Sequence, residues 1–250
     1  MRKKLSVKGI IVILFAFLVC LVALVVSSHL KGDKSQTASQ TSSSKVSTSS
    51  QSSSSSDLPK VSSDDWQLRL VNRDHVTEEL SPSLAEVNGI SVDARIETAV
   101  QEFLAAAQAI DASEHLISGY RSVDYQKELF QSYVDQEMAE DPSLTQEEAE
   151  TKVKTYSQPA GASEHQTGLA IDMSTVDSLN ESDPTVVSQL VEIAPQYGFV
   201  LRFPEGKSSS TGVDYEDWHF RYVGKESAAY MTKHNLTLEE YITKLKENGQ

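Results

Sequence analysis

Cysteine is almost absent from this sequence of 250 residues, which contains only Cys20. A single cysteine cannot form an intramolecular disulfide, so no disulfide cross-link stabilises the fold. The same scarcity excludes a structural zinc site built from cysteines. Any metal bound by the folded part must therefore be held by histidine, aspartate or glutamate.

Basic side chains are also few, with 22 lysines and arginines against 36 aspartates and glutamates. Seven of the bases lie in residues 1–57, which contain only two acids. Residues 58–250 therefore carry 15 bases and 34 acids, a net charge of −19. Binding nucleic acid requires lysine and arginine to neutralise phosphates. This balance excludes nucleic acid as a partner.

Only one long apolar run occurs, the 17 residues Ile10–Val26, and four basic residues precede it. A helix of that length covers roughly 25 Å, close to the hydrocarbon thickness of a bilayer. The positive flank predicts a cytoplasmic N-terminus, so residues 1–30 are interpreted as a cytoplasmic stub and membrane anchor. A signal peptide cleaved near Ser27 and lipidation of Cys20 are the alternatives. All three place the rest of the chain outside the cytoplasm, and the anchor predicts a single-pass membrane protein with an extracellular domain.

Residues 31–57 are nearly all small or polar, and 11 of the 16 residues in 41–56 are serine. Such a segment buries too little apolar surface to offset the entropy of ordering it, so a disordered linker is predicted. As a flexible coil it spans on the order of 30 Å. The remaining residues, 58–250, are predicted to form one folded domain.

Apolar periodicity in residues 58–250 predicts both helices and strands. Helices are expected over 92–110, 122–138 with Ser122 as N-cap, 144–156 as a solvated excursion and 184–197, with two more closing the chain. Extended segments are expected at 68–72, 116–120, 169–173, 199–202 and 218–223. Helices cluster early and hairpin-like strands late, which favours an α+β fold with a small, mostly antiparallel sheet flanked by helices.

Two segments carry the chemistry, Ser163–Asp172 and Glu216–Tyr222. Strand alternation places Asp172 on the face opposite Leu169 and Ile171, where an unpaired acid is costly to bury. The same alternation places His219 away from the apolar side of its strand.

Two histidines, His165 and His219, and one carboxylate, Asp172, form a zinc site of the catalytic type, which keeps a position open for water. Glu216, in the turn before the second strand, is predicted to act as general base beside that water. An ion pair of Asp172 with Arg121 or Arg202 is the alternative that needs no metal.

A third motif, Ser118-Gly119-Tyr120-Arg121-Ser122, accompanies these two segments. Together SGYRS, SEHQTGLAID and EDWHFRYVG resemble the zinc-dependent D-alanyl-D-alanine carboxypeptidases of the VanY type, and most closely their L,D-carboxypeptidase branch (LdcB/DacB). The resemblance runs from about residue 68 to 232. It implies a hedgehog/D,D-peptidase-like fold with one zinc ion. It also implies an activity that removes the C-terminal D-alanine from peptidoglycan stem peptides, as an L,D-carboxypeptidase on tetrapeptides or a D,D-carboxypeptidase on pentapeptides.

Residue by residue, the resemblance makes His165, Asp172 and His219 the zinc ligands and Glu216 the catalytic base. It also assigns substrate binding to three further positions, Arg121, Gln126 and Ser163. Phe203 stands where the family often has tyrosine, so the hydroxyl contact made by that tyrosine is not expected here.

Each substrate residue has an alternative role. An arginine suits a bidentate clamp on a terminal carboxylate. Arg121 is otherwise expected to steady the oxyanion or to form a surface ion pair with Asp124 or Glu128. The alternatives are a solvated side chain for Gln126 and a turn cap for Ser163.

Two other functions are the alternatives. A non-catalytic peptidoglycan-binding module is one alternative, although it has no use for a base beside the metal. A D,D-dipeptidase or endopeptidase acting on the same polymer is another. The protein is expected to be a monomer, with peptidoglycan stem peptides and the membrane as its partners.

Overall fold

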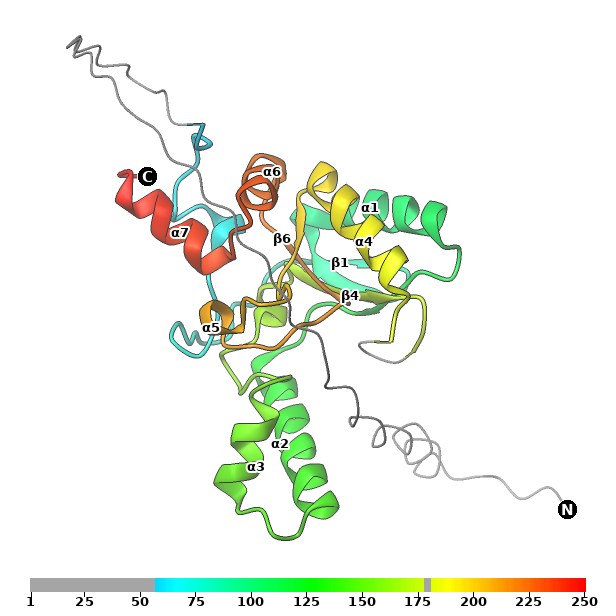
Figure 1. Ribbon diagram of the computed structural model, residues 1–250, viewed down its shortest axis with the longest axis vertical. Coiled ribbons are helices and arrows are strands. Elements are labelled where there is room, and N and C mark those ends of the chain that lie inside the picture. Colours follow the sequence, from blue (N-terminus) through cyan, green and yellow to red (C-terminus); the bar gives the residue numbers. More distant parts are fainter. Residues whose placement is uncertain (1–56, 178–180) are drawn as a thin grey trace, which may run out of the picture. The chain divides into compact units, whose positions relative to one another are not determined.

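A four-stranded antiparallel sheet organises the computed structural model, which describes residues 57–177 and 181–250 (Figure 1). The strands lie in the order β3 (His115–Ser118), β4 (Ala170–Ser174), β6 (His219–Tyr222) and β5 (Phe199–Leu201). The α+β class with a small antiparallel sheet flanked by helices is confirmed. The predicted membrane anchor and all of the predicted linker except Asp57 lie outside the described residues. Within the described ranges, no helix is long and apolar enough to span a bilayer.

The two faces of this sheet differ in chemistry. Ile171 and Phe220 are paired in register and point into the main core, together with Phe103 of α1 (Glu97–Ile110) and Leu190 of α4 (Pro184–Ile193). Figure 1 shows α1 and α4 side by side, above β4 in this view. Since side chains alternate along a strand, the neighbours of Ile171 and Phe220 point to the opposite face. That face carries Asp172 and His219.

A second, two-stranded sheet precedes α1 and was not expected from the sequence. It pairs β1 (Leu84–Val87) with β2 (Ile90–Asp93) through the turn residues Asn88 and Gly89. Both turn residues have positive φ, 50° and 83°, as a two-residue hairpin of this type requires. The Asn-Gly pair is the signal that could have found this hairpin.

The helix predicted over 92–110 is therefore too long at its N-terminal end. Residues 92 and 93 belong to β2, the 3-10 turn η4 covers Ala94–Ile96, and α1 begins at Glu97. Asp93 causes the break, because its carboxylate accepts hydrogen bonds from the backbone and the guanidinium of Arg95. Such side-chain bonds to the local backbone favour turns and helix starts over strand or helix interiors.

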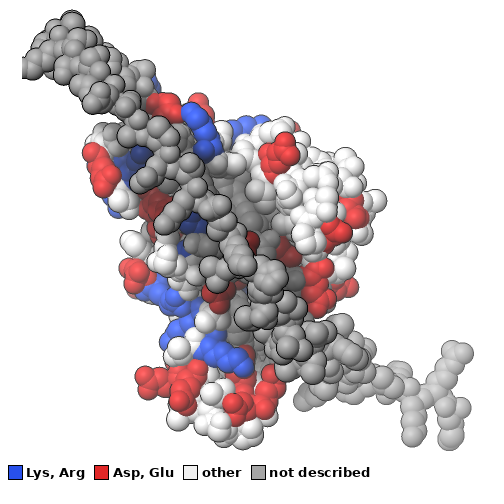
Figure 2. All heavy atoms as spheres, in the orientation of Figure 1, with Lys and Arg blue, Asp and Glu red and all other residues white. Residues whose placement is uncertain are grey.

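The helix predicted from Ser122 is confirmed as α2 (Val123–Glu140), and the hydroxyl of Ser122 accepts a hydrogen bond from the Tyr125 backbone. The next helix, α3 (Gln146–Val153), is shorter than predicted. It is more than a solvated excursion, since α2 and α3 share a small core of their own, formed by Phe130, Val134, Ala149 and Val153. On the face shown in Figure 2, acidic side chains gather at the end of the α2–α3 pair farthest from the sheet.

The predicted strand at 68–72 is wrong. The chain there forms the 3-10 turn η3 (Trp66–Leu68), and Asn72 makes only an isolated bridge to His75. The carbonyls of Gln67 and Arg69 accept hydrogen bonds from the Arg221 guanidinium instead of from a neighbouring strand.

The remaining elements complete the domain. The predicted helix 184–197 divides into α4 and the 3-10 turn η6 (Ala194–Tyr197), which contains Pro195. The chain closes with α6 (Lys225–His234) and α7 (Leu238–Glu247), confirming the two C-terminal helices, and these pack on the segment around Leu68. Two short elements remain, η5 (Glu164–Thr167), which precedes β4, and α5 (Ser208–Thr211), which follows β5.

Candidate metal centre and active site

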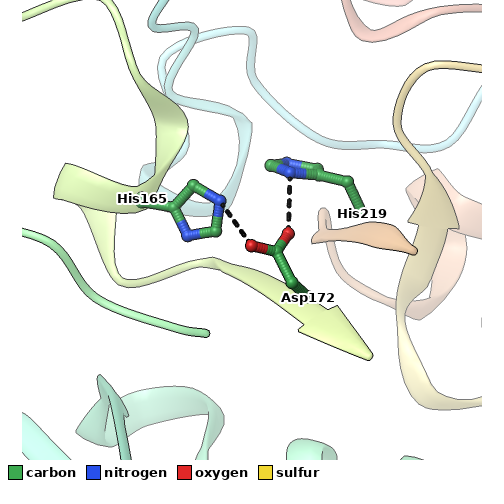
Figure 3. A group of neighbouring side chains, drawn as sticks. All are labelled: His165, Asp172 and His219. Atoms are coloured by element: carbon green, nitrogen blue, oxygen red, sulfur yellow. Dashed lines mark ion pairs between the residues drawn. The ribbon is translucent and has the colours of Figure 1, made fainter. Parts of the chain in front are cut away.

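Three side chains from three elements converge on the polar face of the sheet. His165 comes from η5, Asp172 from β4 and His219 from β6, and one potential ligand atom of each lies within 4.8 Å of the others. Figure 3 shows both imidazole rings turned toward the Asp172 carboxylate. The distances are 3.4 Å from His165 Nε2 to Oδ2 and 3.1 Å from His219 Nδ1 to Oδ1. All three residues are buried.

Strand register fixes two of these residues and a backbone contact fixes the third. Asp172 and His219 are directly opposite each other on β4 and β6, where facing side chains are in contact distance. His165 donates from Nδ1 to the Gly119 carbonyl over 2.6 Å. That bond leaves Nε2 of His165 facing Asp172, because the two ring nitrogens point in different directions.

The donor set fits one zinc ion. Two imidazoles and one carboxylate are a common catalytic zinc set, with a position left for water. Asp172 Oδ1 is buried and makes no hydrogen bond within the described part of the chain, so it is free to accept a cation. Arg121 Nη1 lies 3.8 Å from Asp172 Oδ2, and Arg202 pairs with Glu164 and Glu239 instead. Neither arginine takes the place of the metal between the three ligands.

Electrostatics in the cluster favour an ionised aspartate. Burial by itself raises the pKa of the Asp172 carboxyl, but His165 and His219 outweigh it and hold this pKa well below its usual range. Burial, aided by Arg121, lowers the pKa of His165, which favours the neutral imidazole that a metal needs. For His219, burial opposes protonation, yet the nearby carboxylates of Asp172 and Glu164 favour the charged imidazolium and raise its pKa to about 9. A proton therefore competes with a metal at His219.

Glu216 lies beside the three residues, in the segment that leads into β6. Its backbone N–H donates to the Phe203 carbonyl, and its Oε2 lies 3.7 Å from His219 Nδ1. The side chain is buried, and this burial raises the pKa of the Glu216 carboxyl to about 8, with His219 opposing the rise and Asp172 adding to it. A carboxyl with a pKa near neutral pH both accepts and returns protons readily.

Arg121 lies at the edge of the cluster and is partly exposed, with 21% of its side-chain surface accessible. Its Nη1 donates to Ser118 Oγ over 3.1 Å. Its ionic partner is Asp172, rather than the Asp124 or Glu128 of the surface-pair alternative. A guanidinium in this position is open to an anionic group that enters the site.

Gln126 and Ser163, the other two residues assigned to substrate binding, each make a local contact. Gln126 is buried, not solvated, and its Nε2 donates to the Gln158 carbonyl over 2.7 Å. Its Oε1 makes no hydrogen bond within residues 57–177 and 181–250. Ser163 caps η5, since its hydroxyl accepts from the His165 backbone N–H. This is the turn-capping role that the sequence had left open.

Two contacts of His219 were missed. The Phe203 ring packs against its imidazole with centroids 4.9 Å apart. The Glu164 carboxylate lies 3.5 Å from its Nε2 and also pairs with Arg202 and Arg221. Glu164 stands directly before His165 in the motif, but nothing in the spacing indicated that its side chain reaches the other histidine.

Comparison with known proteins identifies the family. The family model described as "VanY: D-alanyl-D-alanine carboxypeptidase" matches residues 89–225. A D-alanyl-D-alanine carboxypeptidase of Enterococcus faecalis is 34% identical over 180 residues, covering 71% of this chain and 66% of the relative.

Two solved structures are similar as well. The zinc(II) complex of a point mutant of a VanY D,D-pentapeptidase from a VanB-type resistance cassette has a TM-score of 0.64 at 34% identity, covering 71% of this chain and 99% of that one. An L,D-carboxypeptidase, DacB, from Streptococcus pneumoniae has a TM-score of 0.57 at 30% identity, covering 69% and 84%.

The chain spans only part of the first curated relatives that it matches, 66%, 46% and 36% of their lengths. The family match nevertheless covers more than half of the chain, and it includes every residue of the cluster on the polar sheet face. This chain belongs to the VanY family of D-alanyl-D-alanine carboxypeptidases.

Proposed function

We propose that this protein is a zinc-dependent carboxypeptidase that removes the C-terminal D-alanine from peptidoglycan stem peptides. Its substrates are tetrapeptides cut at an L,D bond or pentapeptides cut at a D,D bond, and it serves cell-wall remodelling. One observation carries the proposal. His165, Asp172 and His219 converge with their potential ligand atoms within 4.8 Å, and the buried Glu216 carboxyl lies beside them.

His165, Asp172 and His219 hold the zinc ion in this proposal. Zinc lowers the pKa of a water molecule toward neutrality and polarises a carbonyl group. Glu216 accepts the proton of the water that attacks the penultimate carbonyl. It then returns this proton to the nitrogen of the departing D-alanine. The amide bond breaks, and Glu216 ends the cycle in the ionised form in which it began.

Arg121 accounts for the restriction to chain ends. A guanidinium forms a bidentate pair with the terminal carboxylate of the substrate, which an internal peptide bond does not offer. Gln126 and Ser163 contribute polar groups beside this pair, with the unsatisfied Oε1 of Gln126 as the atom available to a ligand. Ser163 contributes through the turn that it caps, which positions His165.

The proposal includes the location of the domain. The apolar run Ile10–Val26 and its basic flank support a single-pass membrane anchor, and the serine-rich residues 31–57 support a flexible tether. Cleavage near Ser27 and lipidation of Cys20 remain the alternatives. In each case the domain acts outside the cytoplasm, as a monomer. The acidic charge of residues 58–250 supports a function without nucleic acid.

The proposal is tested with the full chain and purified muropeptides, using mass spectrometry to follow the products. We expect the loss of one alanine per stem peptide, abolished by a chelator and restored by zinc. Glu216→Gln should lower turnover at least ~1000-fold, since general-base catalysis and its proton return are both lost, while zinc stays bound at one ion per chain. Zinc content is measured by atomic absorption.

Each other outcome contradicts part of the proposal. Release of a dipeptide identifies a D,D-dipeptidase, and cleaved cross-links identify an endopeptidase. Retention of muropeptides without cleavage identifies a binding module. Activity that survives complete metal removal contradicts the zinc mechanism, and loss of zinc from Glu216→Gln means that Glu216 is a ligand rather than the base.

A further inference from the structure

Glu164 is buried between the candidate metal ligands and two arginines. Its Oε1 accepts hydrogen bonds from Arg202 Nε over 2.8 Å and from Arg221 Nη1 over 2.7 Å. Its Oε2 faces His219 Nε2 at 3.5 Å. Neither Glu164 Oε2 nor His219 Nε2 has a hydrogen-bond partner within the described part of the chain. An unsatisfied acceptor and an unsatisfied ring nitrogen thus face each other in a buried setting, where leaving both unpaired is costly.

The two nitrogens of the His219 ring face different partners. Nδ1 lies 3.1 Å from Asp172 Oδ1, on the side of the cluster, and Nε2 lies toward Glu164. A neutral imidazole has one N–H and one lone pair, and the group that accepts the N–H decides which nitrogen is left for a metal. An acceptor at Nε2 therefore makes Nδ1 the metal-binding nitrogen.

We propose that Glu164 is a positioning residue, whose carboxylate accepts a hydrogen bond from His219 Nε2 and so presents Nδ1 to the metal. This inference rests on the zinc site of the proposed function. A carboxylate behind a metal-bound histidine fixes the tautomer and the ring orientation and makes the imidazole a better donor. Glu164 thus links two of the ligands, since it precedes His165 in the chain and contacts His219 in space.

The arginines hold this carboxylate in place. Arg221 is fixed by the carbonyls of Gln67 and Arg69, and Arg202 is fixed by two hydrogen bonds to Glu239 of α7. Glu164 and Glu239 are therefore two glutamates that contact the same arginine, but only Glu164 reaches His219. This difference supplies a matched control, because the same change at Glu239 disturbs the ionic network without touching a ligand.

The test compares the zinc affinity of the full-length wild type, Glu164→Gln and Glu239→Gln by competition with a chromophoric chelator. We expect Glu164→Gln to weaken zinc binding by about 10- to 100-fold, the usual effect of losing such a partner. Glu239→Gln should stay within about threefold of the wild type, because it leaves the partner of His219 in place. Thermal unfolding of the zinc-free proteins measures how much each variant disturbs the network as a whole.

A second measurement reports the tautomer directly. In the zinc-loaded wild type labelled with 15N-histidine, we expect His219 to carry its proton on Nε2. In Glu164→Gln this N–H signal should move upfield and exchange faster with water, because a charged acceptor has been replaced by a neutral amide. If Glu164→Gln does not fold, Glu164→Asp replaces it, since it keeps the charge but withdraws the carboxylate from His219, and the same loss of affinity is expected.

Three results overturn the proposal: unchanged zinc affinity in a folded Glu164 variant, an equal loss in Glu239→Gln, or a zinc-loaded His219 whose proton sits on Nδ1. These failures differ from a failure of the proposed function. If the wild type binds no zinc, the zinc mechanism itself is wrong. If the wild type binds zinc and cleaves muropeptides while Glu164→Gln binds zinc equally well, only the role of Glu164 is refuted.

Discussion

Single residues in this protein take their roles from their neighbours more than from their own chemistry. Asp172 stays ionised in a buried position because His165 and His219 lower its pKa, whereas burial raises the pKa of Glu216 to about 8. Two carboxyl groups in one site thus have pKa values shifted in opposite directions, which suits the ligand and base roles proposed for them. Separating pKa values in this way is how a site assigns acid and base roles.

Arg121 provides a prediction at this scale. Arg121→Ala should lower kcat/KM by about 100-fold for stem peptides with a free C-terminus, the loss of about 2.7 kcal/mol of charge-assisted binding. Peptides with an amidated C-terminus should lose less than about fivefold, because they have no carboxylate to pair. Steady-state kinetics with the two substrates measures the ratio.

Lys127→Ala is the control for this experiment, since it removes a cation from an exposed position of α2, the helix that follows Arg121. For this variant, the ratio of kcat/KM for the free peptide to kcat/KM for the amidated peptide should match that of the wild type. Equal damage to both substrates in Arg121→Ala contradicts the clamp and points to a role at the oxyanion. Zinc content is measured in parallel, because Arg121 also lies near Asp172.

Secondary-structure elements position the site through a few backbone contacts. Gly119, in the segment between β3 and α2, supplies the carbonyl to which His165 donates. It also packs so closely on β2 that a β-carbon there would lie 2.6 Å from Ile90 Cγ2 and overlap the Ser91 backbone. The SGYRS segment therefore packs against the unpredicted β1–β2 hairpin on one side and contacts His165 of η5 on the other.

Gly119→Ala is therefore expected to act on the metal site from a distance. The added methyl group should shift the 119–122 segment, lower the unfolding free energy by about 1–3 kcal/mol, and weaken zinc binding by displacing the carbonyl that holds His165. Denaturant unfolding and chelator competition measure the two effects.

Gly206→Ala is the matched control, because Gly206 has a positive φ but nothing within 4 Å of its β-carbon position. It should cost about 1 kcal/mol of stability from backbone strain and leave zinc affinity unchanged. A Gly119→Ala protein with wild-type zinc affinity would mean that the Gly119 carbonyl does not position His165.

The whole molecule also carries a buried acid outside the metal centre. Glu114, between α1 and β3, is buried, and neither of its carboxylate oxygens makes a hydrogen bond in the described ranges. Burial, with some repulsion from Asp111, raises the pKa of this carboxyl to about 7 from its ordinary value of 4.5. Between these two values of pH the folded state therefore binds more protons at Glu114 than the unfolded state does.

The pH dependence of stability follows from this difference. As pH rises through that window, the contribution of Glu114 to the unfolding free energy falls, and it stays low above about pH 7. Glu114→Gln should remove this loss of unfolding free energy at high pH, because an amide does not ionise. The variant should be more stable than the wild type by about 2 kcal/mol at about pH 8 and nearly equal to it at about pH 4.5.

Urea unfolding of both proteins across this pH range measures the effect, and the comparison cancels the titration of groups that the two proteins share. The exposed Glu102→Gln serves as the control for losing one surface charge. A stability difference between wild type and Glu114→Gln that does not change with pH would contradict the raised pKa.

Local patterns in the chain were sufficient for the fold class, most elements and the three residues of the candidate metal cluster. Period-2 alternation placed Asp172 and His219 on the polar faces of their strands, because alternation is a local property of extended backbone. Ser122 was recognisable as an N-cap for the same reason, since capping needs only the next three residues. The motif resemblance then supplied the joint role of segments that lie far apart in the chain.

How these segments meet became visible only in three dimensions. The Asp172–His219 register, the Gly119 carbonyl behind His165 and the Glu164 carboxylate behind His219 all join residues from different elements. The failure of the predicted strand at 68–72 has the same origin, because carbonyls in and beside it bind the Arg221 guanidinium, a partner 152 to 154 positions away. Periodicity records which way a side chain points, but contacts between distant elements depend on how strands pair and helices pack, and no local pattern contains that information.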